Sequence, residues 1–84
     1  MQIRVKVTAT LAKILLEHHP GTLMTPPMQD INPWQEITLE YESFEEARRM
    51  VLSFGGAIEV LEPLALSLSV EDFSKQTLKI YLPL

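Results

Sequence analysis

Two adjacent histidines, His18 and His19, have side chains that could bind a metal ion or transfer a proton. Neighbouring positions on a helix point in different directions, so the two rings cannot hold one ion together, and only Glu17 lies nearby as a further ligand. The chain contains no cysteine, which excludes disulfides, zinc–thiolate sites and thiol nucleophiles. We therefore expect no metal and no cofactor, and we interpret the histidines as the frayed end of a helix.

Three glutamates, Glu36, Glu40 and Glu42, offer carboxylates of the kind used in general acid–base catalysis. They occupy the polar positions of an alternating segment, or the turn after it, and no nucleophile or base accompanies them in a catalytic pattern. The sequence therefore favours a solvated face, and we expect a protein that is not an enzyme and has no catalytic residues.

Arg4, Lys6 and Thr8 are spaced two residues apart along one predicted strand, which places them on the same face. Two cations and a hydroxyl could bind a phosphate or an acidic effector, and we take these three residues as the candidate effector site. The alternative is that the cations pair with carboxylates on neighbouring strands, which is the more common role of such residues.

Trp34, Arg48 and Arg49 are the candidates for a partner interface, because tryptophan and arginine are enriched at such surfaces. Each has a simpler alternative. Trp34 could cover one end of the sheet. The helical pattern predicts that Arg48 and Arg49 face outward, so the two arginines could form a solvated helix face with Glu45 and Glu46.

Length and composition describe one small domain. The chain has 84 residues, of which 46% are hydrophobic, enough for a packed core. Its net charge of −4 is the wrong sign for a domain whose main role is to bind a phosphate backbone. No apolar run approaches the roughly 20 residues that span a bilayer, and no secretory signal pattern opens the sequence. We expect a cytoplasmic protein.

Alternation of apolar and polar residues predicts strands, and apolar residues three to four positions apart predict helices. Ser43 and Glu46 form a capping box, and Gly55-Gly56 suits a left-handed helix end. The expected elements of the first half are a strand at 2–8, a helix capped by Thr8 or Thr10 and ending near 19, and an edge strand or irregular edge segment at 22–28. A strand at 35–41, a helix at 44–54 and a strand at 57–61 follow. The last helix starts near 69–72, ends near Tyr81 and has an apolar stripe of Phe73, Thr77 and Ile80.

This order predicts an α+β fold of the ferredoxin-like βαββαβ kind: an antiparallel sheet, both helices on one of its faces, and an added C-terminal helix. The segment 64–68, rich in leucine, is either a short helical turn or an extension.

The chain resembles the WCX domain, the C-terminal extension of bacterial WYL-domain transcriptional regulators. The resemblance covers essentially all 84 residues and is strongest over residues 43–63, while the front half matches by the pattern of its first strand and helix. The resemblance is carried by a helix ending in Leu52-Ser53-Phe54-Gly55, a strand reading Glu59-Val60-Leu61-Glu62-Pro63 and a terminal helix closing on Tyr81. The chain departs from the family pattern in two places. Ser67, not arginine, follows Leu66, and Ile31, not glycine, follows Asp30.

The resemblance implies that residues 1–84 form a single domain at the end of a longer regulator, after a winged helix-turn-helix and a WYL domain. It implies a non-catalytic regulatory and dimerisation role, as a homodimer or docked to the upstream WYL domain. DNA would be bound only through the missing N-terminal domain, and no membrane would be involved.

A sensor domain and an enzyme are the two other functions to compare with this regulatory role. A free-standing ACT-like sensor of small molecules usually binds its ligand at a glycine-bearing turn after the first strand, whereas the first glycine here is Gly21. Ferredoxin-fold enzymes resembling acylphosphatases or CRISPR-associated nucleases need an arginine loop or an aspartate at the end of that strand, where this chain has Thr8.

Overall fold

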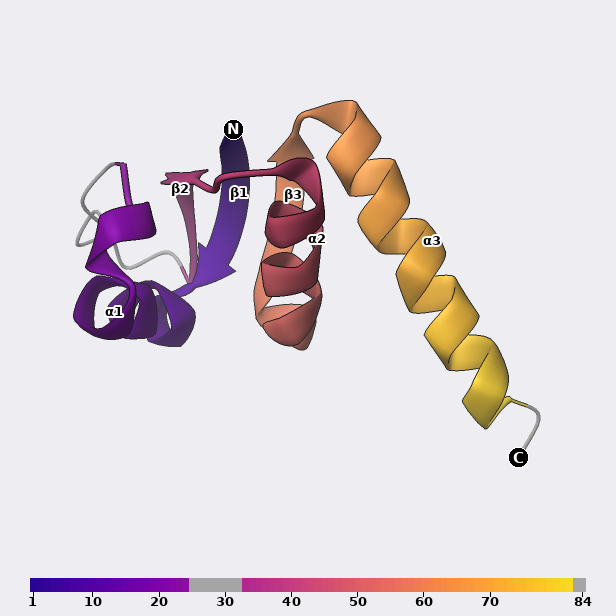
Figure 1. Cartoon of the computed structure of the whole chain (residues 1–84). Coiled ribbons are helices and arrows are strands. Elements are labelled where there is room, and N and C mark those ends of the chain that lie inside the picture. The colour runs from indigo at the N-terminus through magenta and orange to yellow at the C-terminus, as the bar shows by residue number, and fades with distance from the viewer. Residues whose placement is uncertain (25–32, 83–84) are drawn as a thin grey trace.

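A computed structural model describes residues 1–24 and 33–82, and Figure 1 shows the arrangement of their strands and helices. In chain order the elements are β1 (Gln2–Thr8), α1 (Ala9–His18), the short 3-10 helix η1 (Pro20–Thr22), β2 (Trp34–Glu40), α2 (Phe44–Ser53), the 3-10 helix η2 (Gly55–Ala57), β3 (Ile58–Glu62) and α3 (Leu64–Tyr81).

The three strands form one antiparallel sheet in the order β2-β1-β3, with β1 at its centre. Val5 lies opposite Ile37 on one side and Val60 on the other, so apolar side chains from all three strands share a face. The pairing of β1 with β3 is interrupted by a bulge between Arg4 and Val5. The α+β class predicted from the sequence is confirmed.

The ferredoxin-like prediction is not established in full, because the described residues form three strands and the observed order is β2-β1-β3. The edge segment was predicted at 22–28, and its described residues are 22–24. Among these, Leu23 forms an isolated bridge to Leu39, and the Met24 amide donates to the Thr38 carbonyl at 2.9 Å. One bridge does not make a ladder, and residues 25–28 lie outside the described part of the chain.

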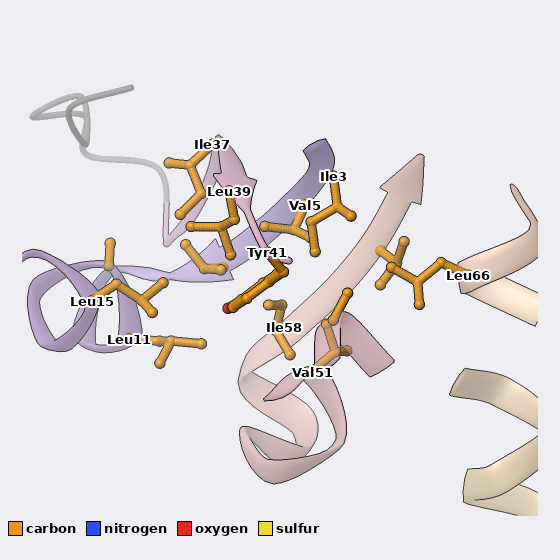
Figure 2. Close-up of a cluster of buried hydrophobic side chains, with 14 residues drawn as sticks. Ile3, Val5, Leu11, Leu15, Ile37, Leu39, Tyr41, Val51, Ile58 and Leu66 are labelled. Atoms are coloured by element: carbon orange, nitrogen blue, oxygen red, sulfur yellow. The ribbon is translucent and has the colours of Figure 1, made fainter. Parts of the chain in front are cut away.

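The core lies on one face of this sheet (Figure 2). Val5, Val7 and Leu15 are fully buried there, and α1 and α2 cover the same sheet face through their own apolar stripes. The helix residues in this cluster are Leu11, Ala12, Leu15, Ala47, Val51 and Leu66. The opposite sheet face carries the polar residues of all three strands.

Side-chain caps fix where the first two long helices begin. Thr8, not Thr10, caps α1, and its hydroxyl accepts a hydrogen bond from the Leu11 amide at 3.2 Å. Ser43 caps α2 as predicted, accepting from the Glu46 amide at 3.1 Å. The Glu46 carboxylate reaches back one residue further than expected, to the Glu42 amide at 2.8 Å.

Gly55 ends α2 with a backbone φ of 60°, the left-handed conformation predicted for this position. We expect Gly55→Ala to lower the free energy of unfolding by about 1–2 kcal/mol, because a Cβ disfavours this backbone conformation. Urea denaturation measures the loss. Gly56→Ala is the matched control, since an added Cβ meets no atom within 4 Å at either glycine and only Gly55 has a positive φ. Equal losses in both variants would contradict the prediction.

The last helix, α3, is one continuous helix of 18 residues, not a leucine-rich turn followed by a new helix near residue 69. The hydroxyl of Ser69 accepts a hydrogen bond from Arg48 at 3.2 Å instead of capping a second helix. Leu66 is fully buried and Val70 packs partly against the core, whereas every residue from 71 to 82 is exposed. In Figure 1 the C-terminal end of α3 runs away from the rest of the domain.

Candidate functional site

Arg4 is the centre of the polar sheet face, where it joins the two outer strands. One of its guanidinium nitrogens, Nη1, donates to Glu36 on β2, and the other, Nη2, donates to Glu62 on β3 at 2.7 Å. The hydrogen bonds that Arg4 donates to these two carboxylates raise its pKa, and the bond to Glu36 has the larger effect. Arg4 therefore pairs with carboxylates on the neighbouring strands, which is the alternative to an effector site that the sequence offers for this residue.

The other two candidate effector residues lie along the same strand. Lys6 is exposed and stands in register between Glu36 and Glu59. The Thr8 hydroxyl accepts the cap bond from Leu11, as described above. A bound anion would thus have to approach cations that already face carboxylates, and the assignment of Arg4, Lys6 and Thr8 to an effector stays a prediction.

The polar sheet face is acidic as a whole, because its two cations are outnumbered by glutamates from both outer strands. These are Glu36, Glu40, Glu59 and Glu62. Glu40 binds the terminal amino group of Met1 at 3.0 Å, so Glu36 and Glu40, two of the carboxylates considered for catalysis, have separate partners. An acidic face of this kind repels a phosphate backbone.

The two histidines do not form a site. His18 is exposed, and the His19 ring stands edge-on to Phe54 at a centroid distance of 6.3 Å. Within residues 1–24 and 33–82, no group of three His, Asp or Glu side chains is placed to hold a metal ion.

Arg48 connects α2 with α3, which corrects the expectation that it faces outward. Its guanidinium lies 4.3 Å from the centroid of the Phe73 ring and 5.8 Å from that of Phe44, and it donates to Ser69. Cation–π contacts of this kind hold two elements together. Arg48 therefore has a structural role inside this domain, whatever further role it has at an interface.

Arg49 and Trp34 occupy different parts of the surface. Arg49 is exposed and, with Arg48 and Phe73, lines an open hollow of about 630 Å³ at the start of α2. Trp34 opens β2 opposite Thr8 and is 39% exposed. The three candidate interface residues are thus not gathered into one patch, and their interface role stays a prediction.

The exposed surface of α3 is the feature that the sequence reasoning missed. The expected apolar stripe included Phe73, Thr77 and Ile80, but Ile80 is 81% exposed because the helix continues past the body of the domain. Leucines on another side of α3 are also exposed, and their regular spacing was the signal that could have revealed this surface.

Comparison with known families bears on the whole of this architecture. The profile of the WCX domain matches residues 1–72, which include the sheet, α1, α2 and the first half of α3. The chain belongs to the WCX domain family. Neither the curated proteins nor the solved structures that were searched gave a significant match.

Membership of the WCX family gives the domain its general role, that of a regulatory C-terminal domain in WYL-type transcription regulators. The matched range contains all of the polar sheet face and Arg48, whereas the C-terminal half of α3 lies beyond it. None of the helices in the described ranges combines the length and apolar character needed to cross a membrane.

Proposed function

We propose that this WCX domain is the non-catalytic regulatory and dimerisation domain of a bacterial, cytoplasmic regulator with the order helix-turn-helix, WYL, WCX. The observation that carries the proposal is the family match over residues 1–72. In this proposal residues 1–84 act as one domain that binds a second copy or the upstream WYL domain.

The surface chemistry of the domain supports a role in protein–protein contact. The polar sheet face presents more carboxylates than cations, so DNA contact belongs to a helix-turn-helix elsewhere in the regulator. The opposite sheet face is filled by the core. Of the exposed large apolar side chains in the described part of the chain, most lie on α3 or directly after it, and this helix is therefore the surface that we expect a partner to contact.

Sedimentation equilibrium of the chain tests the dimerisation part of this proposal. We expect a reversible dimer whose population rises with protein concentration. A chain that stays monomeric at high concentration contradicts self-association. A monomer whose melting temperature rises with an added amino acid or nucleotide would instead favour the ACT-like sensor, because a ligand of the native state stabilises it.

A further inference from the structure

Alternating intervals of four and three positions separate five residues on one face of α3 and Leu82, the residue that caps its C-terminal end. They are Leu64, Leu68, Glu71, Lys75, Leu78 and Leu82. This spacing averages about 3.6 residues, the helical repeat, so the five helical side chains form one stripe of the kind that packs in coiled coils, and Leu82 continues its spacing. We call these six residues the α3 seam.

The seam faces away from the domain. Leu66, which is fully buried, lies two positions from both Leu64 and Leu68 and therefore on the opposite side of the helix. The four seam leucines have exposed fractions of 69% for Leu64, 55% for Leu68, 54% for Leu78 and 53% for Leu82. The attachment of α3 to its own domain thus leaves the whole seam available.

The order of residues in the seam is the same kind of pattern read from either end: two leucines, a charge pair, two leucines. In an antiparallel pair of α3 helices centred at residue 73, Leu64 meets Leu82 of the partner subunit and Leu68 meets Leu78 of the partner subunit. Glu71 then meets Lys75 of the partner subunit, and a two-fold axis repeats each contact in reverse.

We propose that two copies of this chain dimerise through the α3 seam in this antiparallel arrangement. The inference deepens the dimerisation that is part of the proposed function and rests on it. The charges of Glu71 and Lys75 favour a second copy of this chain as the partner and set the direction in which the two helices pair. A parallel pair in register would place Glu71 against Glu71 and Lys75 against Lys75, whereas the antiparallel pair joins unlike charges.

The central charges already form an ion pair within one helix, with Lys75 Nζ 3.0 Å from Glu71 Oε1. Two such pairs brought together about the two-fold axis make a network of four alternating charges between leucine layers. A polar layer inside an apolar seam fixes register, because sliding one helix would bury the charges against leucine. The seam spans about 27 Å at about 1.5 Å per residue, most of the length of α3.

Substitution in an outer layer tests the seam on the full chain. We expect Leu78→Glu to weaken the dimer at least tenfold in sedimentation equilibrium, because each interface then contains two carboxylates in place of two leucines. Ile80→Glu is the control, since Ile80 lies on the same half of α3, is 81% exposed and is outside the seam. Circular dichroism of each variant checks that helix content is retained.

The outcomes separate the two proposals. If the wild-type chain is a dimer and Leu78→Glu dimerises with the same affinity, the seam is overturned and the chain dimerises through another surface. A wild-type chain that is monomeric at high concentration overturns the seam together with the proposed dimerisation. If Ile80→Glu weakens the dimer as strongly as Leu78→Glu, the interface is a different face of α3 and the seam is likewise overturned.

Cysteine cross-linking tests the direction of pairing, and the absence of native cysteine leaves no background. Leu68→Cys and Leu78→Cys are made as separate variants and oxidised alone or mixed. Antiparallel pairing predicts a disulfide-linked dimer mainly in the mixture, where position 68 of one copy meets position 78 of the other. Efficient cross-linking of Leu68→Cys alone would show a parallel pair and contradict the proposal.

Reversal of the central charges tests the selecting pair. Glu71→Lys should weaken the dimer several-fold, since it places lysines against Lys75 of the partner subunit, and the double variant Glu71→Lys/Lys75→Glu should restore it. If the double variant does not recover the dimer affinity of the wild type, Glu71 and Lys75 do not pair across the interface.

Discussion

Leu66→Ala is expected to lower the free energy of unfolding by about 2–4 kcal/mol and to loosen α3 from the domain. Leu66 is the one fully buried residue of α3 within the part of the chain that the structure describes. It lies in the first turn of α3, beside β3 at the edge of the core cluster (Figure 2), so truncation leaves a cavity where the helix meets the sheet. A domain of this length has a total stability of only about 4–12 kcal/mol, so the loss is a large part of it.

Urea denaturation of the wild type and the variant measures this loss, and hydrogen exchange of the α3 amides reports on the loosening. Ile80→Ala is the control, because it removes a side chain of similar size from the exposed half of the same helix. We expect a change of less than about 0.5 kcal/mol there. If both variants lose the same stability, Leu66 is not the anchor of α3.

Tyr41→Phe is expected to raise the free energy of unfolding by about 1–2 kcal/mol, the opposite direction to most core substitutions. The Tyr41 side chain is 3% exposed, and its hydroxyl has no hydrogen-bond partner in the described structure. Burying an unpaired hydroxyl costs free energy that phenylalanine does not incur. The ring itself, shown among the core side chains in Figure 2, keeps its packing in the variant.

Tyr81→Phe is the matched control for this prediction, since Tyr81 is 63% exposed and its hydroxyl is solvated. Thermal and urea denaturation should show a gain for Tyr41→Phe and almost none for Tyr81→Phe. A clear loss of stability in Tyr41→Phe would mean that a partner such as a buried water satisfies the hydroxyl.

The raised pKa of Tyr41 predicts that the free energy of unfolding falls at alkaline pH. Burial raises the pKa of Tyr41, and the nearby Glu46 carboxylate raises it further. The unfolded chain loses the tyrosine proton near the ordinary pKa of about 10, whereas the folded chain keeps it, so ionisation favours the unfolded state. Stability should therefore fall as pH rises above about 10, and this fall should be smaller in Tyr41→Phe.

Local features of the fold were predictable because their causes are local. The alternation along residues 2–8 and 35–41 gave two of the strands, the Ser43 cap gave the start of α2, and Gly55 gave its left-handed end. Each depends on a side chain and a backbone only a few residues apart. The continuity of α3 was not predictable in this way. The Ser69 hydroxyl can cap the start of a helix equally well as it can accept a hydrogen bond from Arg48, and local sequence does not distinguish the two.

The candidate site followed the same division. The face on which Arg4 and Lys6 lie was fixed by strand periodicity, but which carboxylates approach Arg4 depends on the order and register of β2, β1 and β3. The resemblance to the WCX domain identified the family because residues 43–63 carry its pattern, and the family match bears this out. The outward direction predicted for Arg48 was wrong because its packing depends on where α3 crosses α2.

The sequence by itself therefore determined the class of fold, the two ends of α2, the faces of β1 and β2, and the family. Only the tertiary structure decided which apolar stripe of α3 is buried and which is left exposed. Both stripes have helical spacing and both are rich in large apolar residues, so periodicity cannot rank them. The choice is made where Leu66 enters the core and Phe73 meets Arg48, and these contacts leave the seam from Leu64 to Leu82 facing away from the domain.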